Sequence, residues 1–209
     1  ALAFLPYAIF TYTSFKNVPI NFHLIRTRLN FIISSFTKSI ILTFGSYLDK
    51  LIIFPLFGAA LLGNYTLGYQ LFSLAAIVPG IVFQYILPQE SGGINHVKLK
   101  KLTVIVSLIL TILILILAPV VLPILFSEFN ETIVIVQIMS LALVPNAIST
   151  ILMSNLLSHE KIKQVVIGQS ISLTVIVGGI FLLSETFGIL GAAISFTLGN
   201  LIGCIYLFS

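Results

Sequence analysis

Long runs of apolar residues, separated by short polar segments, dominate the chain. From residue 31 onward six such runs occur, at residues 31–57, 65–87, 102–126, 133–157, 165–184 and 187–208. The hydrocarbon core of a bilayer is about 30 Å thick, and a helix of about 20 residues crosses it. The pattern therefore predicts six membrane-spanning helices, which makes the fold an all-α, polytopic transmembrane bundle.

Glycine and proline predict where these helices bend or end. The first run is longer than a straight crossing needs, so its helix is expected to tilt, bend or protrude, and a Gly-Ser pair at 45–46 predicts a flexible point near its middle. Residues 58–64 carry no charge and are predicted to form a turn. A Pro-Gly pair at 79–80 predicts a kink in the second helix, and Pro88 is predicted to end it.

The segment before residue 31 divides into two parts. Residues 1–15 are apolar and lack the basic leading region of a signal peptide, so they are expected to end a helix begun upstream in a longer polypeptide. Residues 16–30 alternate apolar and basic positions, with Arg26 and Arg28 on the basic face. This pattern fits an amphipathic helix on the membrane surface or a simple basic linker. Residues 31–209 are then one six-helix lobe.

Charge alternates along the connections between the predicted spans. The segments before the first span, after the second and after the fourth contain Lys or Arg, whereas those after the first, third and fifth are neutral or acidic. Basic loops remain on the cytoplasmic side of membranes. The sequence thus predicts a multi-pass protein of the cell (plasma) membrane with residues 16–30 and the C-terminus in the cytoplasm.

Composition agrees with this class and excludes others. Of the 209 residues 58% are hydrophobic and 8% are charged, with a mean hydropathy of +1.18, whereas soluble domains contain about a quarter charged residues. The net charge of +4 is distributed over short loops, which does not suit a nucleic-acid-binding surface. Isolated histidines, a single cysteine and the lack of a phosphate-binding loop predict neither an enzyme, nor a metal site, nor a cofactor.

Charged residues inside the first predicted span are candidates for function, because a charge at membrane depth costs roughly 2.5–3.5 kcal/mol or more. Lys38 and Asp49 are eleven residues apart and share a helix face, about 16 Å apart along the axis. In a functional interpretation they line a cavity, where Lys38 meets an anionic headgroup and Asp49 a coupling cation. In the alternative, Asp49 and Lys50 lie at the outer interface and the long side chain of Lys38 extends toward the inner one. Lys50 points about 100° away and is expected to extend toward the outer interface.

Uncharged residues add two further expectations. Among the amides inside the predicted spans, Gln70 and Asn146 are candidates for substrate contact. In the last span small residues recur every four positions and predict one stripe of close helix packing; they are Gly191, Ser195, Gly199 and Gly203.

Several short motifs, in this order and spacing, resemble the polysaccharide and lipid-linked oligosaccharide flippases of the multidrug/oligosaccharidyl-lipid/polysaccharide exporter superfamily. They are YLDKLII at 47–53, LGNYTLGY at 62–69, YILPQES at 85–91, LPILF at 122–126, PNAI at 145–148 and FGILGAAI at 187–194.

The resemblance implies one lobe of a two-lobe exporter, with the partner lobe in the missing N-terminal part of the same polypeptide. It implies that the chain flips a lipid-linked glycan across the bilayer by alternating access. Two alternatives remain: a multidrug/cation antiporter of the same superfamily, in which Asp49 couples export to H⁺ or Na⁺, and a non-transporting membrane assembly subunit.

Overall fold

The computed structural model describes residues 28–125 and 132–209, without the side chains of a few residues between 30 and 46. These residues form seven helices and no strand: α3 (Leu29–Ala75), α4 (Ile77–Ser91), α5 (Val97–Leu125), α6 (Thr132–Ser140), α7 (Leu143–Ser158), α8 (Ile162–Phe187) and α9 (Ile189–Phe208). The chain divides into two compact units, Ala1–Ile33 and Ser34–Ser209, and the second contains the helix packing around the site. The predicted helix end at 1–15 and most of the predicted linker at 16–30 lie outside the described residues.

Five helices in the described residues are long and apolar enough to cross a membrane: Thr43–Ala75, Val97–Leu125, Thr132–Ser158, Ile162–Phe187 and Ile189–Phe208. The prediction of an all-α, multi-pass membrane protein is confirmed at this level. The second predicted span does not appear as a separate long helix, because its residues are divided between α3 and α4, and α4 alone has 15 residues. The six crossings therefore stay a prediction.

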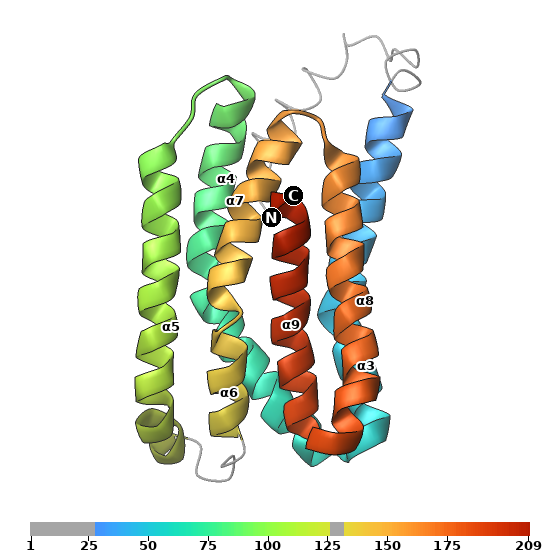
Figure 1. The fold of residues 1–209 in the computed structure, drawn as a ribbon, viewed down its shortest axis with the longest axis vertical. Coiled ribbons are helices and arrows are strands. Elements are labelled where there is room, and N and C mark those ends of the chain that lie inside the picture. The colour runs from blue at the N-terminus through green and yellow to red at the C-terminus, as the bar shows by residue number, and fades with distance from the viewer. Residues whose placement is uncertain (1–27, 126–131) are drawn as a thin grey trace, which may run out of the picture. The chain divides into compact units, whose positions relative to one another are not determined.

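Gly58 divides α3 into two arms. Its backbone angles (φ 78°, ψ 179°) are non-helical, and a positive φ of this kind is readily adopted only by glycine. Residues on both sides are helical, so the turn predicted for residues 58–64 is wrong: the corner is Gly58 itself (Figure 1). Helix α3 is continuous through residues 45–46, and the flexible point expected there stays a prediction.

Two prolines interrupt helices four residues upstream of themselves. Pro79 has no N–H to donate to the Ala75 carbonyl, and α3 ends at Ala75. Pro145 has the same relation to Leu141, which separates α6 from α7. The predicted kink near residue 79 therefore exists, one turn earlier. Pro88 does not end α4, which continues to Ser91, because a proline in the last turn leaves only one carbonyl without its intrahelical partner.

Neighbouring helices donate hydrogen bonds to carbonyls near the α6–α7 break and upstream of Pro119. The Thr197 hydroxyl on α9 donates to the Ile138 carbonyl (2.9 Å), and that of Thr111 on α5 donates to Ser140 (3.2 Å). The Gln137 amide donates to the Leu115 carbonyl (3.0 Å), whose helical partner would be the N–H that Pro119 lacks. Broken backbone at membrane depth is stable only with such partners.

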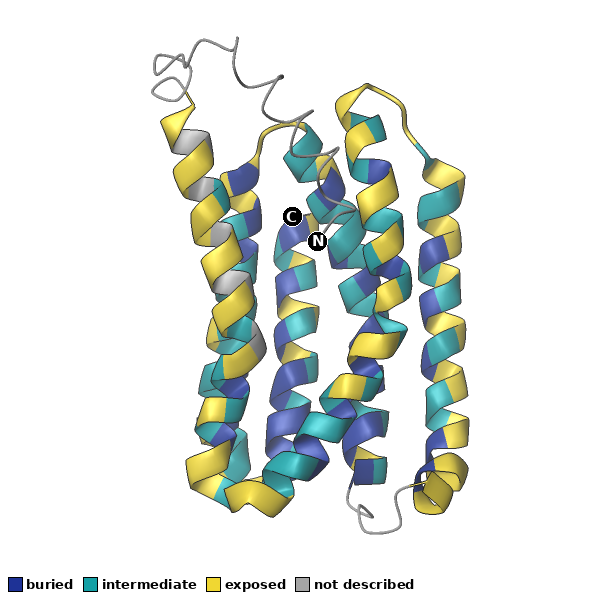
Figure 2. Ribbon diagram, turned by 180° about the vertical axis from the view of Figure 1, so that it is seen from behind, coloured by how far each residue is buried: buried dark blue, intermediate teal, exposed yellow. Residues whose placement is uncertain are grey.

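Within residues 34–209 the helices stand side by side, with α9 between α7 and α8 (Figure 1). Half of the residues in the spans of α6–α7 and of α9 are buried, against about a fifth in α3, α5 and α8 (Figure 2). The buried apolar core joins Tyr65 and Phe72 of α3 to Ile135 and Met139 of α6 and to Phe196 of α9. These inner elements position the site.

Helix α5 has the polarity of a membrane helix. Small polar residues, Thr103, Ser107 and Thr111, are buried at intervals of four, whereas large aliphatic residues such as Ile109 and Ile116 are more than half exposed. In water the aliphatic face would be buried instead. This orientation indicates that lipid surrounds the outer helices.

Candidate functional site

A cavity of about 150 Å³ lies between α3, α7, α8 and α9. Its lining combines amide, hydroxyl, aromatic and aliphatic side chains, and none of them is charged: Gly45, Tyr69, Phe72, Asn146, Gln169, Ser172, Leu173, Ile176, Phe196 and Asn200. Ligand pockets usually measure about 300–1,000 Å³. The cavity is therefore large enough to enclose part of a ligand and too small for a whole one.

Helical spacing explains why these residues share one cavity. Gln169, Ser172 and Ile176 recur at intervals of three and four on α8, as do Phe196 and Asn200 at an interval of four on α9, so each set lies on one helix face. Asn200 comes 11 residues after the start of α9 and 8 before its end. The cavity is thus near the middle of the helix, where a bilayer would be deepest.

The amides of the cavity have hydrogen-bonding capacity left over. In the described part of the chain the Asn146 side chain makes no hydrogen bond. Asn200 donates through Nδ2 to the Phe196 carbonyl of its own helix (2.9 Å), and Gln169 donates only to the sulfur of Met153 (3.1 Å). Each amide has two donors and an acceptor oxygen. A polar, uncharged ligand would supply the missing partners.

A buried ion pair lies beside this cavity. Asp49 is 2% exposed, and the Lys50 ammonium is 3.2 Å and 3.3 Å from its two carboxylate oxygens. The Tyr65 hydroxyl donates to the same carboxylate (2.8 Å), although 16 residues separate them. This contact exists because Gly58 folds the second arm of α3 back on the first. The carboxylate therefore has an ammonium and a phenol as hydrogen-bonding partners.

Tyr69 connects the ion pair to the cavity. The Lys50 ammonium lies 3.7 Å from the centroid of the Tyr69 ring, a cation–π distance. The same ring packs edge-on against Phe196 (centroids 5.8 Å apart), and both residues line the cavity. A movement of either arm of α3 would therefore change the contacts of both the ion pair and the cavity wall.

A second charged cluster lies at the end of the bundle where α4 meets α5. Lys100 forms an ion pair with Glu90, whose other oxygen accepts a hydrogen bond from Ser154 on α7 (2.6 Å). The His96 ring contacts Gln89 in the same region. The sequence predicts only a basic connection after the second span, with no contact between its charges and α7. The feature of the sequence that could have indicated this cluster is Glu90, the one acidic residue in an otherwise basic segment.

The predicted site residues do not gather in one place. Asn146 lines the cavity, whereas Gln70 is exposed and outside its lining. The side chain of Lys38 and all of Arg26 lie outside the described residues, and Arg28 is exposed. Asp49 is buried in the ion pair. The expectation for Lys50 is wrong: its long side chain folds back onto Asp49 instead of extending away.

The four small residues of the last span are all buried in α9, and α8 packs along them. A Cβ atom built on Gly199 would lie 2.8 Å from the Ser172 carbonyl oxygen, and one on Gly203 would lie 2.9 Å from the Ser172 Cβ. The Ser195 hydroxyl donates to the Gly191 carbonyl of its own helix (2.6 Å). Helix α8 therefore both lines the cavity and packs closely against α9, and Ile176 contributes to the lining and to the packing.

The chain matches no protein-family model, no characterised protein and no solved structure. In the described residues no group of three or more His, Cys, Asp or Glu side chains is placed to hold a metal ion.

Proposed function

We propose that the chain is part of a membrane protein that flips a lipid-linked oligosaccharide or polysaccharide precursor, as one six-helix lobe of a two-lobe exporter. The observation that supports this most is the uncharged cavity with three amides and three aromatic rings near the middle of a membrane bundle. Sugar hydroxyls both donate and accept hydrogen bonds, as amides do. A cavity of about 150 Å³ suits one part of a glycan headgroup.

The same cavity favours a glycan over a cationic drug as the substrate. A cation at membrane depth requires an opposing charge, and the lining has none. The nearby Asp49 carboxylate is already paired with Lys50 and hydrogen-bonded to Tyr65. A multidrug antiporter that binds its substrate or coupling ion at Asp49 would first have to open this pair. Coupling to H⁺ or Na⁺ stays a prediction.

In the proposed mechanism the protein performs no covalent chemistry. The lobe shields the polar headgroup in its cavity while the lipid tail remains in the bilayer, and the two lobes rock to open the cavity to each side in turn. Lys38 contacts the anionic part of the headgroup, since it is a basic residue within the first predicted span. The partner lobe would supply the other wall of the cavity.

Glycan export by cells tests this proposal. Deletion of the gene that encodes the chain should cause lipid-linked glycan to accumulate on the cytoplasmic face. Complementation with the Asn200→Leu variant should lower export roughly three- to tenfold at equal protein abundance, because each hydrogen bond lost to the substrate contributes about 1 kcal/mol. The readout is glycan exported per copy of protein.

Asn155→Leu is the matched control, since Asn155 is an exposed amide on α7 that does not line the cavity. It should export as the unmodified protein does. Normal glycan export after deletion would refute the flippase function. Equal losses in both variants would refute the role of the cavity.

A further inference from the structure

An apolar groove of about 410 Å³ lies between α5, α7 and α9, away from the cavity described above. Its walls are aliphatic and aromatic: Val104, Ile105, Ile148, Ile151, Leu152 and Phe208. Two lysines, Lys100 and Lys101, stand at its edge. An apolar groove with cations at one end is complementary to a lipid with apolar acyl chains and an anionic headgroup.

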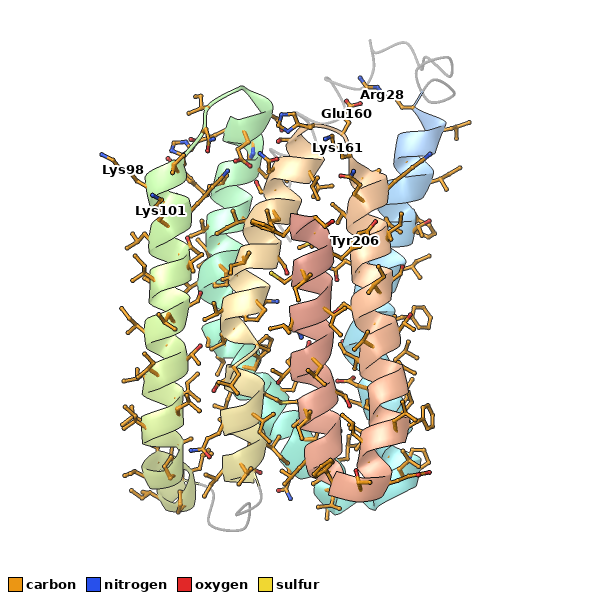
Figure 3. All side chains as sticks on the ribbon, in the orientation of Figure 1. Arg28, Lys98, Lys101, Glu160, Lys161 and Tyr206 are labelled. Atoms are coloured by element: carbon orange, nitrogen blue, oxygen red, sulfur yellow. The ribbon has the colours of Figure 1, made fainter. Side chains whose placement is uncertain are left out.

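The first turns of α5, the helix that forms one wall of this groove, concentrate positive charge, although Lys98 is not itself in the lining. Lys98, Lys100 and Lys101 all lie within the first five residues of the helix, where the helix dipole is also positive. Lys100 is neutralised by Glu90, whereas Lys98 and Lys101 are exposed at the end of the bundle (Figure 3). Cations at this end of a helix are unfavourable by about 0.3–1 kcal/mol each. An anion bound between the lysines would interact favourably with both the lysines and the helix dipole.

The depth of the groove matches the boundary between headgroups and hydrocarbon. Lys101 is four residues from the start of α5, and Ile148 is ten residues from the end of the antiparallel α7. At 1.5 Å per residue the groove therefore extends from roughly 6 Å to roughly 15 Å below this end of the bundle. A phosphate at Lys101 would place the upper part of an acyl chain against Ile105 and Ile148.

We propose that this groove binds an anionic phospholipid of the bilayer, with its phosphate at Lys98 and Lys101 and one acyl chain along the groove. Charge complementarity identifies the occupant, because the lining is apolar and the edge is cationic. A neutral lipid would match only the apolar lining, and a soluble anion only the lysines. An anionic phospholipid matches both. Each lysine near a bilayer surface favours an anionic lipid by about fivefold. The site lies outside the amide-lined cavity and does not depend on the transport function.

Native mass spectrometry of the purified full protein tests the site. Dioleoyl phosphatidylglycerol is titrated in detergent, with dioleoyl phosphatidylcholine and inorganic phosphate as parallel probes. The double variant Lys98→Gln/Lys101→Gln should weaken phosphatidylglycerol binding by roughly tenfold or more. Ile105→Trp, which fills the groove, should weaken it to a similar extent. Phosphatidylcholine should bind more weakly, and inorganic phosphate should not compete.

Matched controls isolate both halves of the site. Lys161→Gln/Lys163→Gln removes two exposed lysines at the start of α8, which contributes no residue to the lining of this groove, and Ile109→Trp adds the same bulk one turn deeper on α5, outside the lining. Both should bind phosphatidylglycerol normally. Equal binding of the two lipids, displacement by inorganic phosphate, or unchanged binding in either test variant would overturn the proposal.

Discussion

Asp49 illustrates how a single charged residue is accommodated among apolar helices. Its carboxylate has an ammonium from Lys50 and a phenol from Tyr65 as partners, and Tyr69 covers the ammonium. Asp49 is buried, with its side chain 2% exposed, whereas the Lys50 side chain is 19% exposed. Breaking such a pair costs more than the pair itself contributes, because the remaining charge has no solvent to stabilise it.

Removal of one charge should therefore be worse than removal of both. Lys50→Met is expected to destabilise the protein by about 3 kcal/mol, and the double variant Asp49→Asn/Lys50→Met by much less. The free energy of unfolding in detergent, measured for both single variants and the double, gives the comparison. Additive effects of the two single changes would show that the carboxylate and the ammonium do not interact.

At the scale of the helices, proline and glycine determine where the backbone breaks and where helices touch. Breaks precede Pro79 and Pro145 by one turn, and at the break before Pro145 hydroxyls of Thr197 and Thr111 on other helices donate to the neighbouring carbonyls of Ile138 and Ser140. The glycines on α8 and α9 do not break these helices; they let the two helices approach closely. Gly58 is the exception, since its positive φ makes the corner of α3.

A methyl group added at Gly199 should separate α8 from α9. Its Cβ would be 2.8 Å from a backbone carbonyl of Ser172, which cannot rotate away, so Gly199→Ala is expected to destabilise the protein by about 1–3 kcal/mol. Gly178→Ala is the control, because a Cβ there meets nothing within 4 Å. It should be neutral or stabilising through helix propensity. Thermal unfolding of the two variants in the same detergent compares them, and equal midpoints would contradict close packing at Gly199.

At the scale of the whole bundle, the ends differ in charge. Within residues 34–209, the α4–α5 and α7–α8 connections lie at one end, with Lys98, Lys101 and Lys161, and the C-terminus points the same way (Figures 1 and 3). The α8–α9 turn lies at the other end (Figure 1), and Glu185 belongs to the last turn of α8 just before it. The positive-inside rule then predicts that the lysine end faces the cytoplasm.

Cysteine labelling of intact cells tests this orientation. In a Cys204→Ser background, Glu185→Cys should react with a membrane-impermeant maleimide from outside, whereas Lys163→Cys should react only after the cells are permeabilised. Both positions are exposed, so accessibility depends on the side of the membrane alone. Labelling of Lys163→Cys in intact cells would invert the predicted topology.

The sequence by itself determined the class of the protein and most of its helices. Apolar runs at 102–126, 165–184 and 187–208 correspond to α5, α8 and α9, because only a long helix satisfies its own backbone in a bilayer. Pro79 also predicts a break in the helix. The break lies one turn upstream of Pro79, because the carbonyl that loses its N–H donor belongs to the residue four positions earlier.

Only the tertiary structure decided which polar residues meet. Asn146 and Asn200 are 54 residues apart and line one cavity, and Asp49 reaches Tyr65 because a single glycine folds α3 back on itself. In a membrane protein both the lipid-facing and the buried sides of a helix are apolar. The pattern of hydrophobicity along the chain therefore locates the helices, while the direction that each polar side chain faces depends on how the helices pack.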